Sequence, residues 1–188
     1  MLSKIVQETA DAVTAAIEGT DDVMTALRTA VKNQVVGVFQ DTSDVSTTGM
    51  NAIGDVVTGA IQSAANVGTS LTDATQTTVR GVIVGVSEVG GDVITATRKT
   101  VHTAITSTAS VGGDIGSVAV AAVEEAIDAA GSVGVSSTEA VQAAVVGAIK
   151  AADESSSEAG NAVRDALLSA ASLPHDMVEK AISGSSEE

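Results

Sequence analysis

Residues 89–114 read VGGDVITATRKTVHTAITSTASVGGD, in which the four letters VGGD return after 22 positions. Working outward from this stretch, the chain divides into eight blocks of this same length, from Met1 to Asp176, without an insertion. Position 13 of the blocks is always aliphatic: Val13, Val35, Val57, Val79, Val101, Val123, Val145 and Leu167. Position 17 is Ile in six of the eight blocks, and position 22 is never apolar. A gapless period of this length indicates a repeat architecture.

The period matches an α-helix. Twenty-two residues in six turns give about 3.67 residues per turn, close to the helical value of about 3.6. On such a helix, positions 1, 5, 8, 9, 12, 13, 16, 17 and 20 form one wide apolar stripe. We therefore expect an all-α protein of elongated amphipathic helices, arranged as a long hairpin or a coiled-coil-like bundle. Residues 1–176 form the repeats, and residues 177–188 a short final helix and a frayed tail after Pro174.

The glycines allow two interpretations. Four of them share one position of the repeat: Gly68, Gly90, Gly112 and Gly134. In the first interpretation they end helices of about 17 residues, and residues 19–22 and 41–44 show similar stop-and-cap signals. In the second, the helix continues through them, to about 280 Å if fully extended. The gapless spacing favours the continuous helix, because turns usually tolerate insertions. A few hinges would turn that helix into a long hairpin.

A β-solenoid is the minor alternative. Residues 79–86, VRGVIVGV, and several Thr-x-Thr pairs suit strands. The alanines at repeated positions and the period of about 3.67 favour the helix instead.

Composition limits the partners. Nine Lys and Arg against 24 Asp and Glu give a net charge of −15, which disfavours nucleic acid and anionic membranes. Without cysteine, neither disulfides nor thiolate chemistry is available. We see no apolar run of about 20 residues and no signal core in residues 1–8, so we expect no transmembrane segment and, by default, a cytoplasmic protein.

No catalytic, cofactor-binding or metal-binding motif is recognisable. The two histidines, His102 and His175, have no ligand partner at a suitable spacing and are expected at the surface. The adjacent acids Glu124 and Glu125 point apart on a helix, as neighbours do. We therefore expect a protein that is not an enzyme and needs no cofactor.

Threonine and glutamine recur on the polar and flanking faces at intervals of 11 residues, which is about 16.5 Å along a continuous helix. The candidate surface-binding residues are Thr14, Thr25, Gln40, Thr47, Thr58, Gln62 and Thr69. A second row, at positions 9 and 20, includes Thr75, Thr97 and Thr108, and a third, at positions 7 and 18, includes Thr29, Thr95 and Thr106. Regularly spaced hydroxyl and methyl groups on a rigid rod would match a crystal lattice through many weak contacts.

These rows resemble the type I antifreeze proteins of flatfish, including their long dimeric helical-hairpin form. The acidic, Gly- and Thr-bearing repeats are also similar to bacterial methane-clathrate-binding proteins. The resemblance lies in periodicity and composition over nearly all of the eight blocks rather than in a motif. Arg80, Gly91 and His102 interrupt the first row after residue 69. The resemblance implies a non-enzymatic protein that adsorbs to ice or to methane clathrate hydrate and modifies crystal growth.

Two alternatives remain open. Segments such as residues 89–91 and 99–101 resemble the synucleins and exchangeable apolipoproteins, whose amphipathic repeats coat lipid, although the rows of Lys typical of such helices are missing. The third possibility is a purely structural helical oligomer. Because an apolar stripe does not stay exposed to water, we expect a homodimer, with the two copies antiparallel.

Overall fold

The computed structural model describes Gln7, Asp11 and residues 23–41 and 47–185. In this part of the chain there are eight helices and no strand, so the all-α prediction is confirmed. Residues 79–86, the candidate strand, lie inside a helix. The helices are α2 (Val23–Asp41), α3 (Thr47–Val67), α4 (Leu71–Glu88), α5 (Val93–Ser110), α6 (Ile115–Ser132), α7 (Ser137–Ser155), α8 (Ser157–Ser169) and α9 (His175–Ser185).

The prediction of a continuous helix is wrong, because the chain turns at the repeated glycines. Successive helices begin at position 5 of successive blocks, at Leu71, Val93, Ile115 and Ser137. Each of these helices follows a glycine with positive φ, from 70° to 78°: Gly68, Gly90, Gly112 and Gly134. Only glycine adopts this left-handed conformation without a steric penalty. Of the signal at residues 41–44, Asp41 is the last residue of α2, while residues 42–44 and the signal at residues 19–22 lie outside the described residues.

Each turn closes the preceding helix in the same way. At the end of α4, the Gly91 N–H donates to the Val86 carbonyl at 2.9 Å, and the Gly90 N–H donates to the Ser87 carbonyl at 3.1 Å. These two bonds define a Schellman motif, which satisfies carbonyls that the helix leaves unpaired. Asp92 then caps the next helix, accepting a hydrogen bond from the Thr95 N–H at 3.0 Å. The VGGD motif is therefore a complete helix stop and start in four residues.

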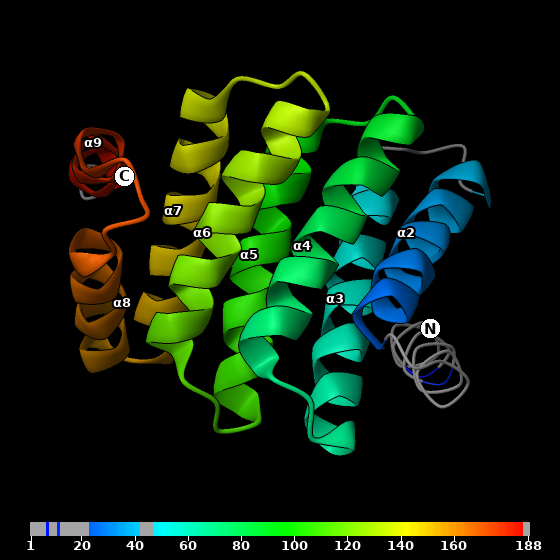
Figure 1. Ribbon diagram of the computed structural model, residues 1–188, viewed down its shortest axis with the longest axis horizontal. Helices are drawn as coiled ribbons and strands as arrows, with labels where there is room; N and C mark the ends of the chain where they lie inside the picture. The colour runs from blue at the N-terminus through cyan, green and yellow to red at the C-terminus, as the bar shows by residue number, and fades with distance from the viewer. Residues whose placement is uncertain (1–6, 8–10, 12–22, 42–46, 186–188) are drawn as a thin grey trace.

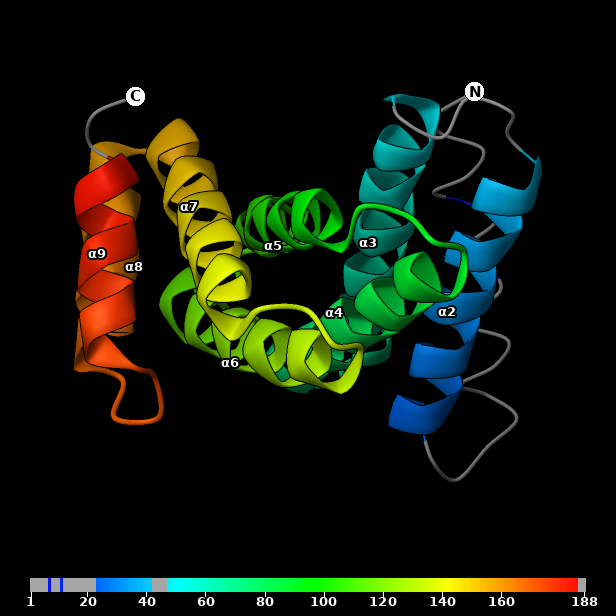
Figure 2. The ribbon, with the colours of Figure 1, turned by 90° about the horizontal axis from the view of Figure 1, so that it is seen from above.

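The helices form two layers. Each central helix packs most extensively on the helix two places along the chain. One layer therefore contains α2, α4 and α6, and the other contains α3, α5 and α7, while α8 and α9 pack on α7 at the end of these layers (Figures 1 and 2). From α3 to α7 the chain crosses between the layers at each turn, so that these successive helices run in opposite directions, whereas α9 lies across α8 (Figure 1).

The apolar stripe fills the space between these helices. In α4 and α5, positions 8, 9, 12, 13, 16, 17 and 20 of the repeat are all buried, as the period predicts. The second threonine row belongs to this stripe: Thr75, Thr97 and Thr108 are buried, and a surface role for them is wrong. The side chains are small, so the core gains its burial from many short contacts between closely spaced helices.

Glycine allows the closest approaches within a layer. A Cβ on Gly81 of α4 would lie 3.1 Å from the Arg28 carbonyl of α2. A Cβ on Gly147 of α7 would lie 2.6 Å from the Arg98 carbonyl of α5. A side chain at Gly147 would overlap the facing backbone, and one at Gly81 would require its neighbours to shift by a few tenths of an ångström.

The fold removes the reason for expecting a dimer. The apolar stripe is covered by helices of the same chain, so it does not need a second copy to leave water. After Pro174 the chain forms α9, which packs on α7 and extends through Ser185, into the residues expected to be a tail. None of the described helices is long and apolar enough to cross a bilayer.

Candidate functional site

The predicted surface-binding residues do not form one row. Thr25 and Gln40 are exposed near opposite ends of α2, Thr58 and Gln62 are half-buried on α3, and Thr69 lies in the turn between α3 and α4. Thr14 and the side chain of Thr47 lie outside the described residues. Because α2 and α3 belong to different layers, the straight array along a single rod is wrong.

The structure instead brings threonines together across neighbouring helices. Thr58 and Gln62 lie on the outer side of α3, and Thr95, Thr103 and Thr106 on the outer side of α5. We call these five residues the α3–α5 face. The two helices touch here, because Thr58 Oγ1 accepts a hydrogen bond from Ser107 Oγ at 3.3 Å. Gln62, Thr95 and Thr106 belong to the third row of the sequence, which the fold leaves at the surface.

Charged groups on this side lie near groups of opposite charge. Burial raises the pKa of Asp55 on α3, and the positive charge of Lys99 on α5 opposes that rise. Further along, His102 Nε2 lies 2.9 Å from Glu154 Oε2 of α7. His102 is thus a partly exposed residue bound to a carboxylate. Within the described ranges, no three His, Cys, Asp or Glu side chains come together as a metal site requires.

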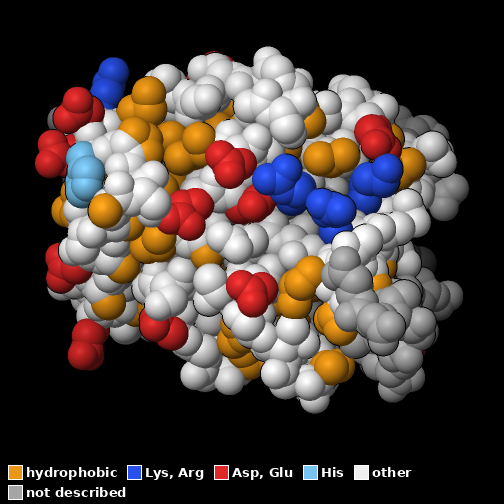
Figure 3. All heavy atoms as spheres, in the orientation of Figure 1, with side chains coloured by type: hydrophobic (Ala, Val, Ile, Leu, Met, Phe, Trp, Pro, Cys, Tyr) orange, Lys and Arg blue, Asp and Glu red, His pale blue; other side chains and the backbone are white. Residues whose placement is uncertain are grey.

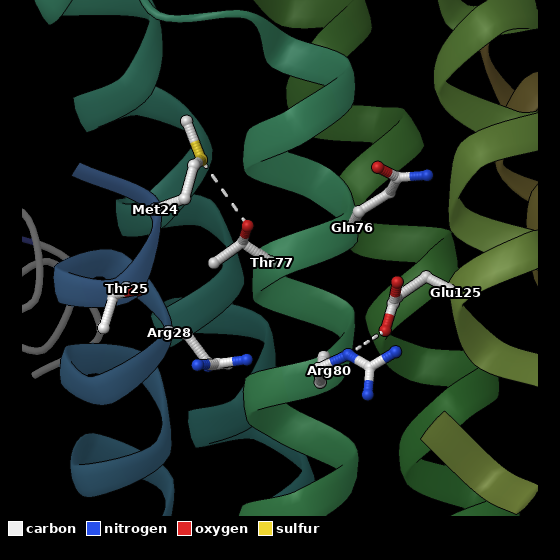
Figure 4. A pocket seen from close by; sticks show the side chains of 7 residues that line it. All are labelled: Met24, Thr25, Arg28, Gln76, Thr77, Arg80 and Glu125. Atoms are coloured by element: carbon white, nitrogen blue, oxygen red, sulfur yellow. Dashed lines mark hydrogen bonds and ion pairs between the residues drawn. The ribbon is translucent and has the colours of Figure 1, made fainter. Parts of the chain in front are cut away.

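The opposite layer carries a groove lined by basic residues. Arg28 and Lys32 on α2 and Arg80 on α4 line a hollow between these two helices, which we call the basic groove. Their side chains form one blue patch over α2 and α4 in Figure 3. Figure 4 shows Arg28 reaching from α2 towards α4, while the Arg80 guanidinium points towards Glu125 on α6.

Two of the three cations have carboxylate partners. Lys32 Nζ lies 3.0 Å from Glu88 Oε1, and Arg80 forms an ion pair with Glu125. Glu125 is largely shielded from solvent, and burial raises the pKa of its carboxyl, while the Arg80 charge opposes the rise. Desolvation disfavours the carboxylate, and the nearby charges of Arg80 and Arg28 favour it.

The sequence analysis did not predict the basic groove. The i, i+4 pair Arg28 and Lys32 was a visible signal for a charged helix face, but Arg80 is remote along the chain and joins them only through the packing of α2 on α4.

No protein-family model matches this chain, and no curated protein matches it.

Proposed function

We propose that the chain is a non-enzymatic protein that adsorbs through the α3–α5 face to an ordered water lattice, ice or a gas hydrate such as methane clathrate, and modifies its growth. The observation that supports this proposal is the division of the helix surfaces. The apolar stripe of each helix points into the core between the helices. The hydroxyl and amide side chains of two adjacent helices, α3 and α5, share one outer side.

Adsorption needs groups held at fixed positions. Neighbouring helices of one layer are about 8–10 Å apart, and successive turns of one helix are about 5.4 Å apart. Threonines on two such helices form a two-dimensional set of methyl and hydroxyl groups. Each contact with surface water is weak, but a preorganised face makes several at once with little loss of conformational entropy.

The α3–α5 face suits this role better than the opposite layer. The outer side of α2 and α4 gathers Arg28, Lys32 and Arg80 in one groove, and Arg28 makes no ion pair with the described residues, so its guanidinium organises water around itself. On the α3–α5 face, Asp55 and Lys99 lie near each other and their charges compensate in part.

A coat for lipid droplets is less well supported. A synuclein-like helix binds lipid with its apolar face, and in this fold that face is packed against other helices. Lipid binding would require the array to open. A purely structural array has the same fold and would show no effect on ice, hydrate or lipid.

Crystal growth of ice and of tetrahydrofuran hydrate tests the proposal, with albumin at equal mass as the reference. The variant Gln62→Glu/Thr106→Glu places two charges on the α3–α5 face. The control Thr29→Glu/Gln40→Glu makes the same two changes on α2, and although Gln40 was a candidate from the sequence, α2 lies in the other layer, outside the α3–α5 face. Thr29 and Thr106 are matched locally, since each hydroxyl donates to the carbonyl four residues earlier, at 2.9 and 3.0 Å.

We expect faceted or arrested crystals with the wild type and with the α2 control, and unrestricted growth with the α3–α5 variant. Circular dichroism should be the same for all three proteins. Wild-type crystals that resemble those grown with albumin would contradict adsorption. Equal loss in both variants, at unchanged helicity, would contradict the assignment of the face.

A further inference from the structure

We propose that the basic groove binds a phosphate-type oxyanion at the Arg28 guanidinium, with Lys32 and Arg80 lining the same groove. This inference does not depend on the proposed adsorption, because the groove lies in the other layer. It begins with the crossing of α2 and α4, where a Cβ on Gly81 would lie within 3.1 Å of the Arg28 carbonyl. At this crossing the Arg28 side chain extends from α2 along the groove towards α4, while the Arg80 guanidinium lies on the far side of α4, facing Glu125 (Figure 4).

The gathering of positive charge is unusual for this chain. Three of its nine Lys and Arg residues line one groove in a protein of net charge −15. Arg28 is exposed and, among the described residues, makes no ion pair. Its guanidinium therefore has hydrogen-bond donors to offer to a ligand.

The carboxylates hold the other two cations in place. Glu125 orients the Arg80 guanidinium from the α6 side, and Glu88 holds Lys32 at 3.0 Å. A cation already fixed by one partner loses little side-chain entropy when it meets a second anion. The same carboxylates limit affinity, because an entering anion is repelled by them.

Size and donor chemistry point to a small oxyanion. Two adjoining cavities, of about 190 and about 300 Å³, share Arg28 and Arg80 as walls. Gln76 of α4 lines the first of them and supplies a neutral amide donor, whereas the Thr77 hydroxyl already donates to the Met24 sulfur at 3.5 Å. Guanidinium groups bind tetrahedral oxyanions through paired N–H donors, and a divalent phosphate gains more from three cations than a carboxylate does. The ligand is thus inorganic phosphate or the phosphate of a small monoester.

The test is a titration of the ¹⁵N-labelled full chain, followed by amide chemical shifts. Inorganic phosphate and glycerol phosphate are added in separate arms, with sodium chloride at matched ionic strength as the reference. We expect saturable shifts in α2 and α4 with at least one phosphate, and the arm that saturates first identifies the form that binds better. Arg28→Gln should weaken that binding about tenfold.

Arg98→Gln is the matched control. Arg98 is an exposed arginine on α5, in the other layer, and its loss should leave the titration unchanged. Shifts that follow chloride alone, or an equal effect of the two arginine variants, would overturn the proposal. An amide spectrum of each variant without phosphate shows that the fold is intact, so that failure to fold is not mistaken for failure to bind.

Discussion

Gly147 shows at the scale of one residue how the array is held together. Its missing side chain lets α7 contact the backbone of α5, where an added Cβ would lie 2.6 Å from the Arg98 carbonyl. Neither helix can yield at that point without losing packing on both sides, since the contact is with backbone rather than with a flexible side chain.

We predict that Gly147→Ala lowers the free energy of unfolding by about 1–3 kcal/mol, as overpacking of a tight contact does. Gly131→Ala is the matched control, because an added Cβ at this helical position of α6 meets no atom within 4 Å. It should raise stability by up to about 1 kcal/mol through helix propensity. Urea unfolding of the two variants measures both effects, and a Gly147→Ala protein as stable as the wild type would show that α5 and α7 do not meet here.

Residue positions in the core were the part of the fold that sequence predicted best. Val79 and Ile83 in α4, and Val101 and Ile105 in α5, are fully buried, as their repeat positions require. Threonine was harder to assign. Thr97 and Thr106 both lie in α5, yet the first is buried and the second exposed. Their side chains have the same chemistry, so only the helix face separates them.

At the scale of elements, the sequence favoured a continuous helix where the structure has turns, and there is a physical reason for this. Gapless spacing favours a continuous helix if turns vary in length. Here all four turns that contain a glycine of positive φ use the same two Schellman hydrogen bonds. Helices of unequal length would no longer align with their neighbours in a layer, so packing fixes the length of helix and turn together. The positive charge of the basic groove depends on the same alignment, which periodicity alone does not give.

The N-caps predict how stability depends on pH. Hydrogen bonds from the Thr95 side chain and backbone lower the pKa of Asp92, and those from Ser117 lower the pKa of Asp114. A carboxyl whose pKa is lower in the folded state than in the unfolded state stabilises the fold. Its full contribution is present when the pH is above the unfolded pKa, near 3.8, and is lost as the pH falls through the folded pKa. Both caps therefore weaken in acid.

We predict that the variant Asp92→Asn/Asp114→Asn retains most of the wild-type stability at pH 7, because Asn is a good N-cap. As the pH falls below about 5, this variant should lose less stability than the wild type. The double Ala variant should lose about 1 kcal/mol per cap at pH 7. Thermal unfolding across this pH range measures both. An Asn variant with the same acid dependence as the wild type would mean that other carboxyls, such as Asp153 beside Arg164, control it.

At the scale of the whole molecule, the rows of threonine change their meaning. A rod would repeat them along one axis, whereas the array divides them between two layers and a core. The α3–α5 face arises only because α3 and α5 become neighbours, and the basic groove only because α2 and α4 do. Neither adjacency follows from the period, which would be the same in a rod.

Small-angle X-ray scattering of the monomer tests the two-layer array most directly. A folded chain of this length should have a radius of gyration of about 16–20 Å. A continuous helix of about 280 Å would give about 80 Å, and a hairpin of half that length about 40 Å. We predict the smallest of these values, at a scattering mass near 18.4 kDa. A radius of gyration as large as that of the hairpin or of the rod, at the mass of a monomer, would contradict the array, and with it both the α3–α5 face and the basic groove.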